Sequence, residues 1–228
     1  MNKRRALVIV TLLLLAGSGL SQAPGSSAGL NELLARLPAN SAAIRQDLLE
    51  LEAADIRALC GMLTEPGPGE DAKARYALHG LAMVLGEPQQ AEARGRFIEA
   101  LAQALVATPA PRDPDFLLAQ LQFAGDERVV PAVTALLANE RHCGRAAHVL
   151  VAVGGEPALA ALRQALAAAQ GSCRVSIILA LGELKDTGSV AVLLTDAAAA
   201  DETLRAAALH ALARSGAPEA KDVLLKAA

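Results

Sequence analysis

The sequence has few aromatic residues: its 228 residues include three Phe, one Tyr and no Trp. A core cannot be built around large rings, so it has to be assembled from the aliphatic residues of a chain that is 53% hydrophobic. Alanine and leucine are the best helix formers, and small side chains let helices approach closely with little loss of side-chain entropy. The composition predicts an all-α protein, with one stacked array of helices rather than two separate globules.

Motifs of enzymatic chemistry are also missing. The chain has no Gly-rich phosphate loop, no G-x-S-x-G elbow and no H-E-x-x-H helix. Its carboxylates are scattered, and a solvated helix turn explains the grouping of Glu50, Glu52 and Asp55. We therefore predict that the protein is not an enzyme, holds no cofactor and has no catalytic residue.

The N-terminus has the three parts of a secretory signal peptide. Residues 1–23 contain three positive charges, an apolar run from Ala6 and a patch of small residues that ends at Ala23. The apolar run is about 15 residues long, shorter than the roughly 20 that span a bilayer, which favours export over a membrane anchor. We predict a periplasmic or secreted protein, with a flexible leader over 24–29 and no membrane span in the mature chain.

Basic residues form no run after this N-terminal segment. Removal of the predicted signal peptide leaves 18 basic and 24 acidic residues, which is a net charge of −6. Binding to nucleic acid needs clustered positive charge. We therefore predict no nucleic-acid partner.

Four segments of the chain resemble one another. Each consists of an arginine, about three turns of Ala, Leu and Val, and a break at Gly, Pro or Asp. They are RYALHGLAMVLGEP from Arg75, RAAHVLVAVGGEP from Arg145, RVSIILALGELKD from Arg174 and RAAALHALARSGAP from Arg205. The last three arginines are 29 and 31 residues apart, and DFLLAQLQFAG from Asp115 occupies the interval before them without an arginine. Further segments with one apolar stripe alternate with this set, at 129–139, 157–169 and 190–200.

A helix with one apolar stripe cannot bury that stripe alone. Two antiparallel helices per unit of about 30 residues bury it by stacking into a solenoid. We predict a right-handed α-solenoid over 30–228 with about five helix pairs and a terminal half-repeat, in which short helices over 30–50 cover the first pair. The predicted pairs are 53–64 with 71–86, 88–107 with 114–124, 127–138 with 143–154, 156–169 with 173–184, and 188–199 with 202–215.

Three features give these units a family resemblance: Pro131 in a first helix, Asn139 in the turn, and the arginines that open the second helices. In these features the chain resembles HEAT-repeat proteins, in particular the short repeats related to phycobilin lyases. The resemblance covers about residues 53–228. It implies the fold rather than the function, because this architecture serves scaffolds, adaptors and a few enzymes.

The last segment, APEAKDVLLKAA, is a first helix with no second helix after it. Its charged residues supply a solvated side, and its apolar side consists of Val223, Leu224 and Leu225. Solenoid ends need a polar outer cap. We predict that the half-repeat is this cap, and the alternative is that another chain covers it.

Two of the three cysteines occupy nearly the same place in consecutive units. Cys143 lies two residues before Arg145, and Cys173 lies one residue before Arg174. Neighbouring thiols in an exported protein favour oxidation, so we predict a disulfide, with two packed free thiols as the alternative. The bond closes a loop of 31 residues. Cys60 lies too far along the array to reach either partner, and we predict a buried free thiol there.

The histidines do not complete a metal site. His142, Cys143 and Cys173 supply three candidate zinc ligands, but a site needs about four and no fourth recurs at matching spacing, so we predict no metal. His79 and His148 each lie nine residues before a proline, where other units have aliphatic residues, and we predict that both are partly buried. His210 is predicted to lie at the surface.

Solenoids offer an extended concave surface to their partners. We predict a non-enzymatic interaction scaffold that binds a protein or peptide on its second helices, with Arg75, Gln120 and Gln122 as contact residues. The resemblance to phycobilin lyases implies an alternative, a tetrapyrrole-lyase-like cofactor attachment enzyme or chaperone. The export signal and the scarcity of aromatic residues argue against that alternative. A third possibility is a structural spacer in a larger secreted complex.

Overall fold

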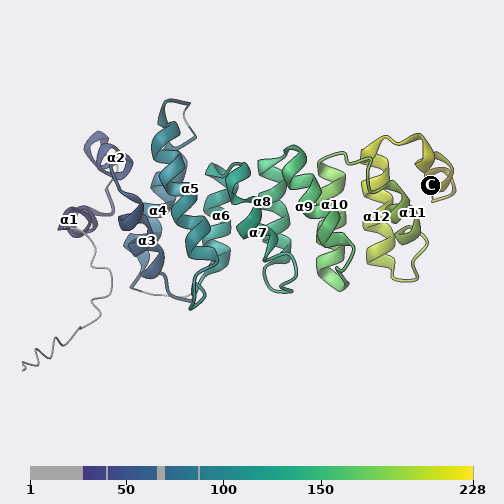
Figure 1. The fold of residues 1–228 in the computed structure, drawn as a ribbon, viewed down its shortest axis with the longest axis horizontal. Coiled ribbons are helices and arrows are strands. Elements are labelled where there is room, and N and C mark those ends of the chain that lie inside the picture. Colours follow the sequence, from purple (N-terminus) through teal and green to yellow (C-terminus); the bar gives the residue numbers. More distant parts are fainter. Residues whose placement is uncertain (1–27, 40, 66–69, 87, 228) are drawn as a thin grey trace, which may run out of the picture.

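The fold is known from a computed structural model that describes residues 28–39, 41–65, 70–86 and 88–227. These residues form thirteen α-helices and three short 3₁₀ helices, with no strand among them. The prediction of an all-α protein is therefore confirmed. The helices follow one another along an elongated molecule, from α1 at one end to α12 and the C-terminus at the other (Figure 1).

The predicted signal peptide and residues 24–27 of the predicted leader lie outside the described residues. The first helix, α1 (Ala28–Arg36), begins inside the segment that was predicted to be a flexible leader. α2 (Ala42–Leu49) follows, and Ser41 caps it by accepting a hydrogen bond from the N–H of Ile44. Both short helices pack against the next long helix of the second set, as predicted for residues 30–50.

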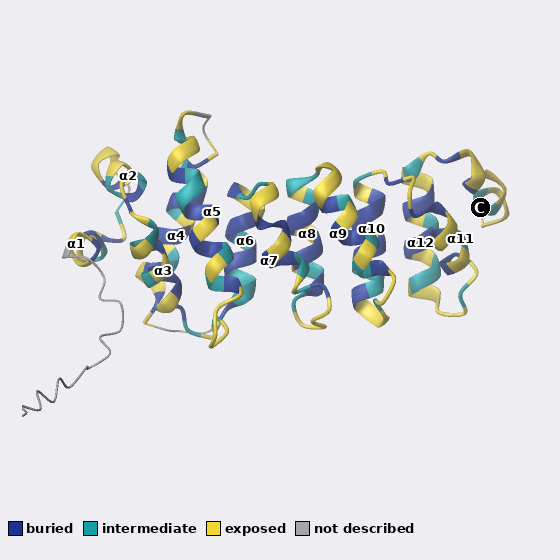
Figure 2. Ribbon diagram, viewed as in Figure 1, coloured by how far each residue is buried: buried dark blue, intermediate teal, exposed yellow. Residues whose placement is uncertain are grey.

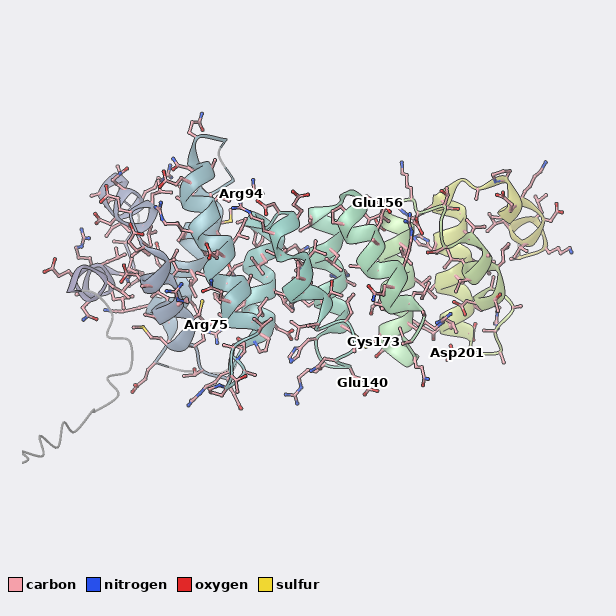
Figure 3. The ribbon with its side chains drawn as sticks, in the orientation of Figure 1. Arg75, Arg94, Glu140, Glu156, Cys173 and Asp201 are labelled. Atoms are coloured by element: carbon pink, nitrogen blue, oxygen red, sulfur yellow. A yellow bond between two sulfur atoms is a disulfide. The ribbon has the colours of Figure 1, made fainter. Side chains whose placement is uncertain are left out.

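Each of the five predicted pairs is formed by two helices in contact. Their N-terminal ends lie on opposite sides: Glu156, at the start of a first helix, is at the top of Figure 3, and Cys173, at the start of its partner, is near the bottom. The two helices of a pair are therefore antiparallel. The pairs are α3 (Ala53–Gly61) with α4 (Ala72–Val84), α5 (Ala91–Leu105) with α6 (Pro114–Ala124), α7 (Val130–Thr134) with α8 (Cys143–Val153), α9 (Gly155–Leu166) with α10 (Gly171–Glu183), and α11 (Val190–Asp196) with α12 (Glu202–Ser215).

Neighbouring pairs pack through like helices. The second helices contact one another in the order α4, α6, α8, α10 and α12, and the first helices α3, α5, α7 and α9 do the same. The core lies between these two layers and runs along the molecule (Figure 2). It consists of Leu, Ala, Ile and Val, with Phe97 as its one fully buried aromatic side chain.

Small residues set the closest approach between helices. A Cβ atom added to Gly182 on α10 would lie 2.8 Å from Cα and 3.0 Å from Cβ of Ala211 on α12. Two side chains as small as hydrogen and methyl therefore let these helices touch through their backbones. The contact shows why small residues are needed where α10 and α12 meet.

The repeated arginines bind carbonyl groups at or just after the C-terminal ends of the preceding helices. Arg75 donates to the carbonyl of Thr64, Arg174 to those of Leu166 and Ala169, and Arg205 to those of Ala199 and Ala200. The last carbonyls of a helix have no partner within it, and they carry partial negative charge, so a guanidinium stabilises that end. The arginine of the repeat thus holds the turn after the preceding helix, and at Arg174 it also reaches Leu166, the last residue of α9. Arg145 differs, because its Nε lies 3.8 Å from Oδ1 of Asp115.

The helix predicted over 127–138 is shorter than expected. A 3₁₀ helix covers Glu127–Val129, α7 ends at Thr134, and the turns that follow reach Asn139. The hydroxyl of Thr134 donates to the carbonyl of Val130 at 2.6 Å. β-Branched residues and hydroxyl bonds to the preceding turn both weaken an α-helix, which explains the early end.

The terminal half-repeat consists of a 3₁₀ helix at Pro218–Ala220 and α13 (Lys221–Ala227). Gly216 ends α12 just before this half-repeat, with φ +67°, a left-handed conformation that glycine adopts without strain. Val223 and Leu224 pack against the core, whereas Leu225 is 68% exposed. The helix thus covers the end of the array with only part of its predicted apolar side.

Candidate functional site

The second helices expose large apolar side chains on α4 and α6. Tyr76 and Met83 on α4 are 38% and 57% exposed, and Phe123 on α6 is 58% exposed. His79 on α4 is exposed between them, with its ring 5.9 Å from that of Phe123 in an edge-to-face arrangement. We call Tyr76, His79, Met83 and Phe123 the aromatic patch.

The patch is held by polar contacts from both sides. Nδ1 of His79 donates to Oε1 of Gln120 at 3.0 Å, and the amide nitrogen of Gln120 donates to the carbonyl of Phe116. The hydroxyl of Tyr76 donates to the carbonyl of Ala39 at 3.2 Å. These contacts hold the rings of Tyr76 and His79 in place.

Arg75 on α4 contacts α6, so it connects the two helices that carry the patch. Its guanidinium lies 4.8 Å from the centroid of the Phe116 ring, a cation–π contact. Nε donates to Asp71 at 3.0 Å, and Nη1 donates to Asp113 at 2.7 Å. The bonds from Arg75, together with one from the backbone N–H of Thr64, lower the pKa of Asp71 below its usual value, so this carboxylate stays charged.

Two of the three predicted contact residues serve the fold instead. Gln120 is 2% exposed, and its amide is used by His79 and Phe116, so the prediction that it faces a partner is wrong. Arg75 is occupied by Asp71, Asp113 and the carbonyl of Thr64. Gln122 is exposed beside Phe123, where the structure leaves it accessible. Helical periodicity places a residue on a face, but it does not show which polar groups are satisfied internally.

The remaining second helices continue the same face with smaller or polar groups. His148 on α8, Leu179 on α10 and His210 on α12 are 31 residues apart in sequence, and all three are exposed. The predicted partial burial of His79 and His148 is therefore wrong, because both side chains point away from the core. The surface position predicted for His210 is confirmed.

The aromatic patch was not predicted from the sequence, although the composition contained its signal. The chain has four aromatic residues, and three of them, Tyr76, Phe116 and Phe123, lie on α4 and α6. Their concentration on two neighbouring helices is the informative observation.

The two cysteines at the starts of α8 and α10 form a disulfide. The sulfur atoms of Cys143 and Cys173 are 2.09 Å apart and their Cα atoms 5.5 Å apart, as the repeat register predicts. The bond consumes both thiols, and they cannot ligate zinc with His142. Nδ1 of His142 instead lies 2.8 Å from Oδ1 of Asp115 on the neighbouring second helix.

The described part of the chain holds no group of three or more His, Cys, Asp or Glu placed to bind a metal ion. Cys60 is a buried free thiol, as predicted. Burial raises its pKa to about 12, which keeps the sulfur protonated and poorly nucleophilic. The described residues include no helix long and apolar enough to cross a bilayer.

No protein-family model matches this chain, and a search of curated proteins finds no significant match. The function of the chain therefore has to be inferred from its own residues and their geometry.

Proposed function

We propose that the chain is an exported, right-handed α-solenoid of the HEAT type that binds a protein or peptide partner through the aromatic patch and catalyses no reaction. One observation carries the proposal. In a chain that is 2% aromatic, both aromatic side chains that are substantially exposed lie together on α4 and α6.

The chemistry of the patch suits recognition of an apolar segment. Aromatic rings supply a large contact area with few rotatable bonds, and methionine adapts its shape to a partner. Interfaces between proteins are enriched in Tyr, Phe and Met. His79 and Tyr76 are held by hydrogen bonds to Gln120 and Ala39, so little side-chain entropy remains to be lost on binding. Gln122 lies at the edge, where a polar rim is expected.

The compartment in this proposal follows from the disulfide between α8 and α10. The disulfide between Cys143 and Cys173 suits an oxidising environment, and disulfides are rare in the cytosol. The periplasm of a bacterium, reached through the N-terminal signal, supplies that environment.

A site-specific cross-linker tests the proposal. A photoreactive phenylalanine analogue at position 123 should cross-link one abundant partner in periplasmic extract. The same analogue at Val192 is the matched control. Val192 is 41% exposed and lies on α11, which is the first helix of its pair. Loss of the cross-link in Tyr76→Ala, with the helical content unchanged, would assign it to the patch. Equal labelling from both positions, or none above background from position 123, would contradict the proposal.

A further inference from the structure

A cavity of about 390 Å³ lies at the opposite layer, between the C-terminal ends of α3 and α5 and the loop that leads to α6. Arg57, Cys60 and Gly61 line it from α3, and Gln103 and Ala104 line it from α5. Its volume falls in the range of small-molecule sites, which is about 300–1,000 Å³. The patch on α4 and α6 contributes no residue to it.

Two arginines give the cavity a positive charge. Arg57 and Arg112 both line it, and no carboxylate does. Nη1 of Arg57 donates to the neutral amide oxygen of Gln103 at 3.2 Å, and neither arginine has an ion-pair partner among the described residues. Arg75 and Arg174, in contrast, are neutralised by aspartates. Two unpaired guanidiniums at one cavity form a site for an anion with planar oxygen geometry.

The helix ends do not cancel this charge. α3 and α5 both end beside the cavity, and each C-terminus contributes roughly half a negative charge at most. Two full positive charges against about one negative charge leave an excess of about one. The site therefore favours a single carboxylate.

The rest of the wall is apolar. Leu63, Ala104, Ala107 and Pro109 line the cavity together with the protonated sulfur of Cys60. A charged head group alone would leave this wall in contact with water, whereas an apolar body next to the head group would cover it. A ligand that suits this cavity therefore has both a carboxylate head group and an apolar body.

The equivalent cavity two pairs further along supplies a comparison within the same molecule. It measures about 410 Å³, lies between the ends of α7 and α9, and is lined by Glu140, Gln164 and Gln170 without any arginine or lysine. The helix packing thus produces the hollow, and the arginines are particular to the first one.

We propose that the cavity beside Cys60 binds a small amphipathic carboxylate. The carboxylate lies between Arg57 and Arg112, and its apolar body lies against Leu63, Ala104 and Pro109. This site is independent of the partner proposed for the aromatic patch.

Octanoate is the first probe for the test, added to the full mature chain and followed by calorimetry and by NMR shifts of residues around the cavity. A peptide with a free C-terminal carboxylate is the second. We expect saturable binding at one site. Octylamine should not bind, and octanol should bind at least tenfold more weakly than octanoate, because it lacks the charge that the arginines recognise. Equal binding of octanol and octanoate, or no saturation with either carboxylate, would overturn the proposal.

Two variants connect binding to the cavity. R57Q combined with R112Q should weaken octanoate binding at least tenfold. Gly61→Phe should block it sterically, because a side chain at Gly61 meets no atom within 4 Å of its Cβ and extends into open space. Gly61→Ala is the folding control for that position, and Glu140→Gln in the second cavity should leave binding unchanged. Undiminished affinity in the double arginine variant would refute the site.

The peptide arm distinguishes the source of the carboxylate. An acetylated Ala-Ala-Leu tripeptide with a free C-terminus is compared with its C-terminal amide. Binding of octanoate alone assigns the site to free fatty acids, and binding of the peptide acid but not the amide assigns it to a chain terminus. Either result supports the proposal, and failure of both acids contradicts it. The cross-linking experiment at position 123 tests a different site, so its outcome does not depend on these binding results.

Discussion

The two pairs from α3 to α6 and the three pairs from α7 to α12 are built on the same plan, yet they use different residues at their surfaces and contacts. The first region exposes Tyr76, Met83 and Phe123 and has a cavity with two unpaired arginines. The second has no Phe, Tyr or Trp, and it is joined by the Cys143–Cys173 disulfide and by the contact of Gly182 with Ala211. The exposed aromatic side chains and the arginine-lined cavity are thus concentrated in one half of the array, and the disulfide and the closest helix contact lie in the other.

The largest effect on stability is expected from the disulfide. Cys143→Ser combined with Cys173→Ser opens a loop between residues 30 positions apart in sequence, and the free energy of unfolding should fall by about 3.5 kcal/mol. Urea denaturation of the oxidised protein and of the double variant measures this difference. Reductant should destabilise the wild type by a similar amount and leave the double variant unchanged. A difference of less than about 0.5 kcal/mol would mean that the bond adds little to the second region.

The contact between α10 and α12 comes next. Gly182→Ala places a methyl group 2.8 Å from Cα of Ala211, so the helices have to separate, and we expect a loss of about 2 kcal/mol. Gly61→Ala in the first region is the matched control, because its new methyl group meets nothing and alanine favours a helix by up to about 1 kcal/mol. In thermal unfolding, Gly182→Ala should lower the melting temperature and Gly61→Ala should raise it. Changes of the same sign would contradict this comparison of the two regions.

Asp186 joins α9 to the loop after α10 in the second region. Its carboxylate accepts hydrogen bonds from Arg163 and from the N–H groups of Gly188 and Ser189. Burial raises the pKa of Asp186, but these bonds outweigh burial, and the pKa lies below its usual value of 3.8. The stabilisation is therefore present above pH 3.8 and is lost as the pH falls through the folded-state pKa.

Asp186→Asn should accordingly lower the free energy of unfolding by about 1–2 kcal/mol at neutral pH, since it weakens a charged hydrogen bond. The difference from the wild type should shrink as the pH falls below 3.8. Denaturant unfolding across pH 2.5 to 7 (roughly the range of the transition) measures this slope. Asp222→Asn on the exposed side of α13 serves as the control, and its difference from the wild type in free energy of unfolding should not change with pH in this way. If that difference changed with pH as it does in Asp186→Asn, Asp186 would be ruled out as the cause.

The helix pairs were predictable because two signals agree along the chain. Breaks at Gly, Pro and Asp recur at the spacing of Arg145, Arg174 and Arg205, and the Ala and Leu runs between them have helical length. The disulfide followed from the same register, since equivalent positions in stacked units are neighbours. The short α7 was not predictable from apolar spacing, because Val130, Val133 and Thr134 satisfy that spacing while weakening the helix.

The site was harder to predict because it depends on which polar groups are already satisfied. Gln120 and Arg75 look available in the sequence, and only the positions of His79, Asp71 and Asp113 show that both are occupied. Each residue step turns a helix by about 100°, so an error of one position moves a side chain from the core to the surface. His79 and His148 were misplaced in this way.

The smallest effect on stability is expected at the surface of the first region. Phe123→Ala removes a ring that is 58% exposed, and its edge-to-face contact with His79 is its one described aromatic contact. We expect a change in the free energy of unfolding within about 0.5 kcal/mol, as for most surface substitutions. Leu179→Ala, at a site 40% exposed on α10, should behave alike in denaturant. A loss above about 1 kcal/mol in Phe123→Ala alone would make the ring a structural support for His79. A near-zero change in both variants would exclude a structural role for the ring and leave the proposed binding as the reason why so scarce a residue type lies at this surface.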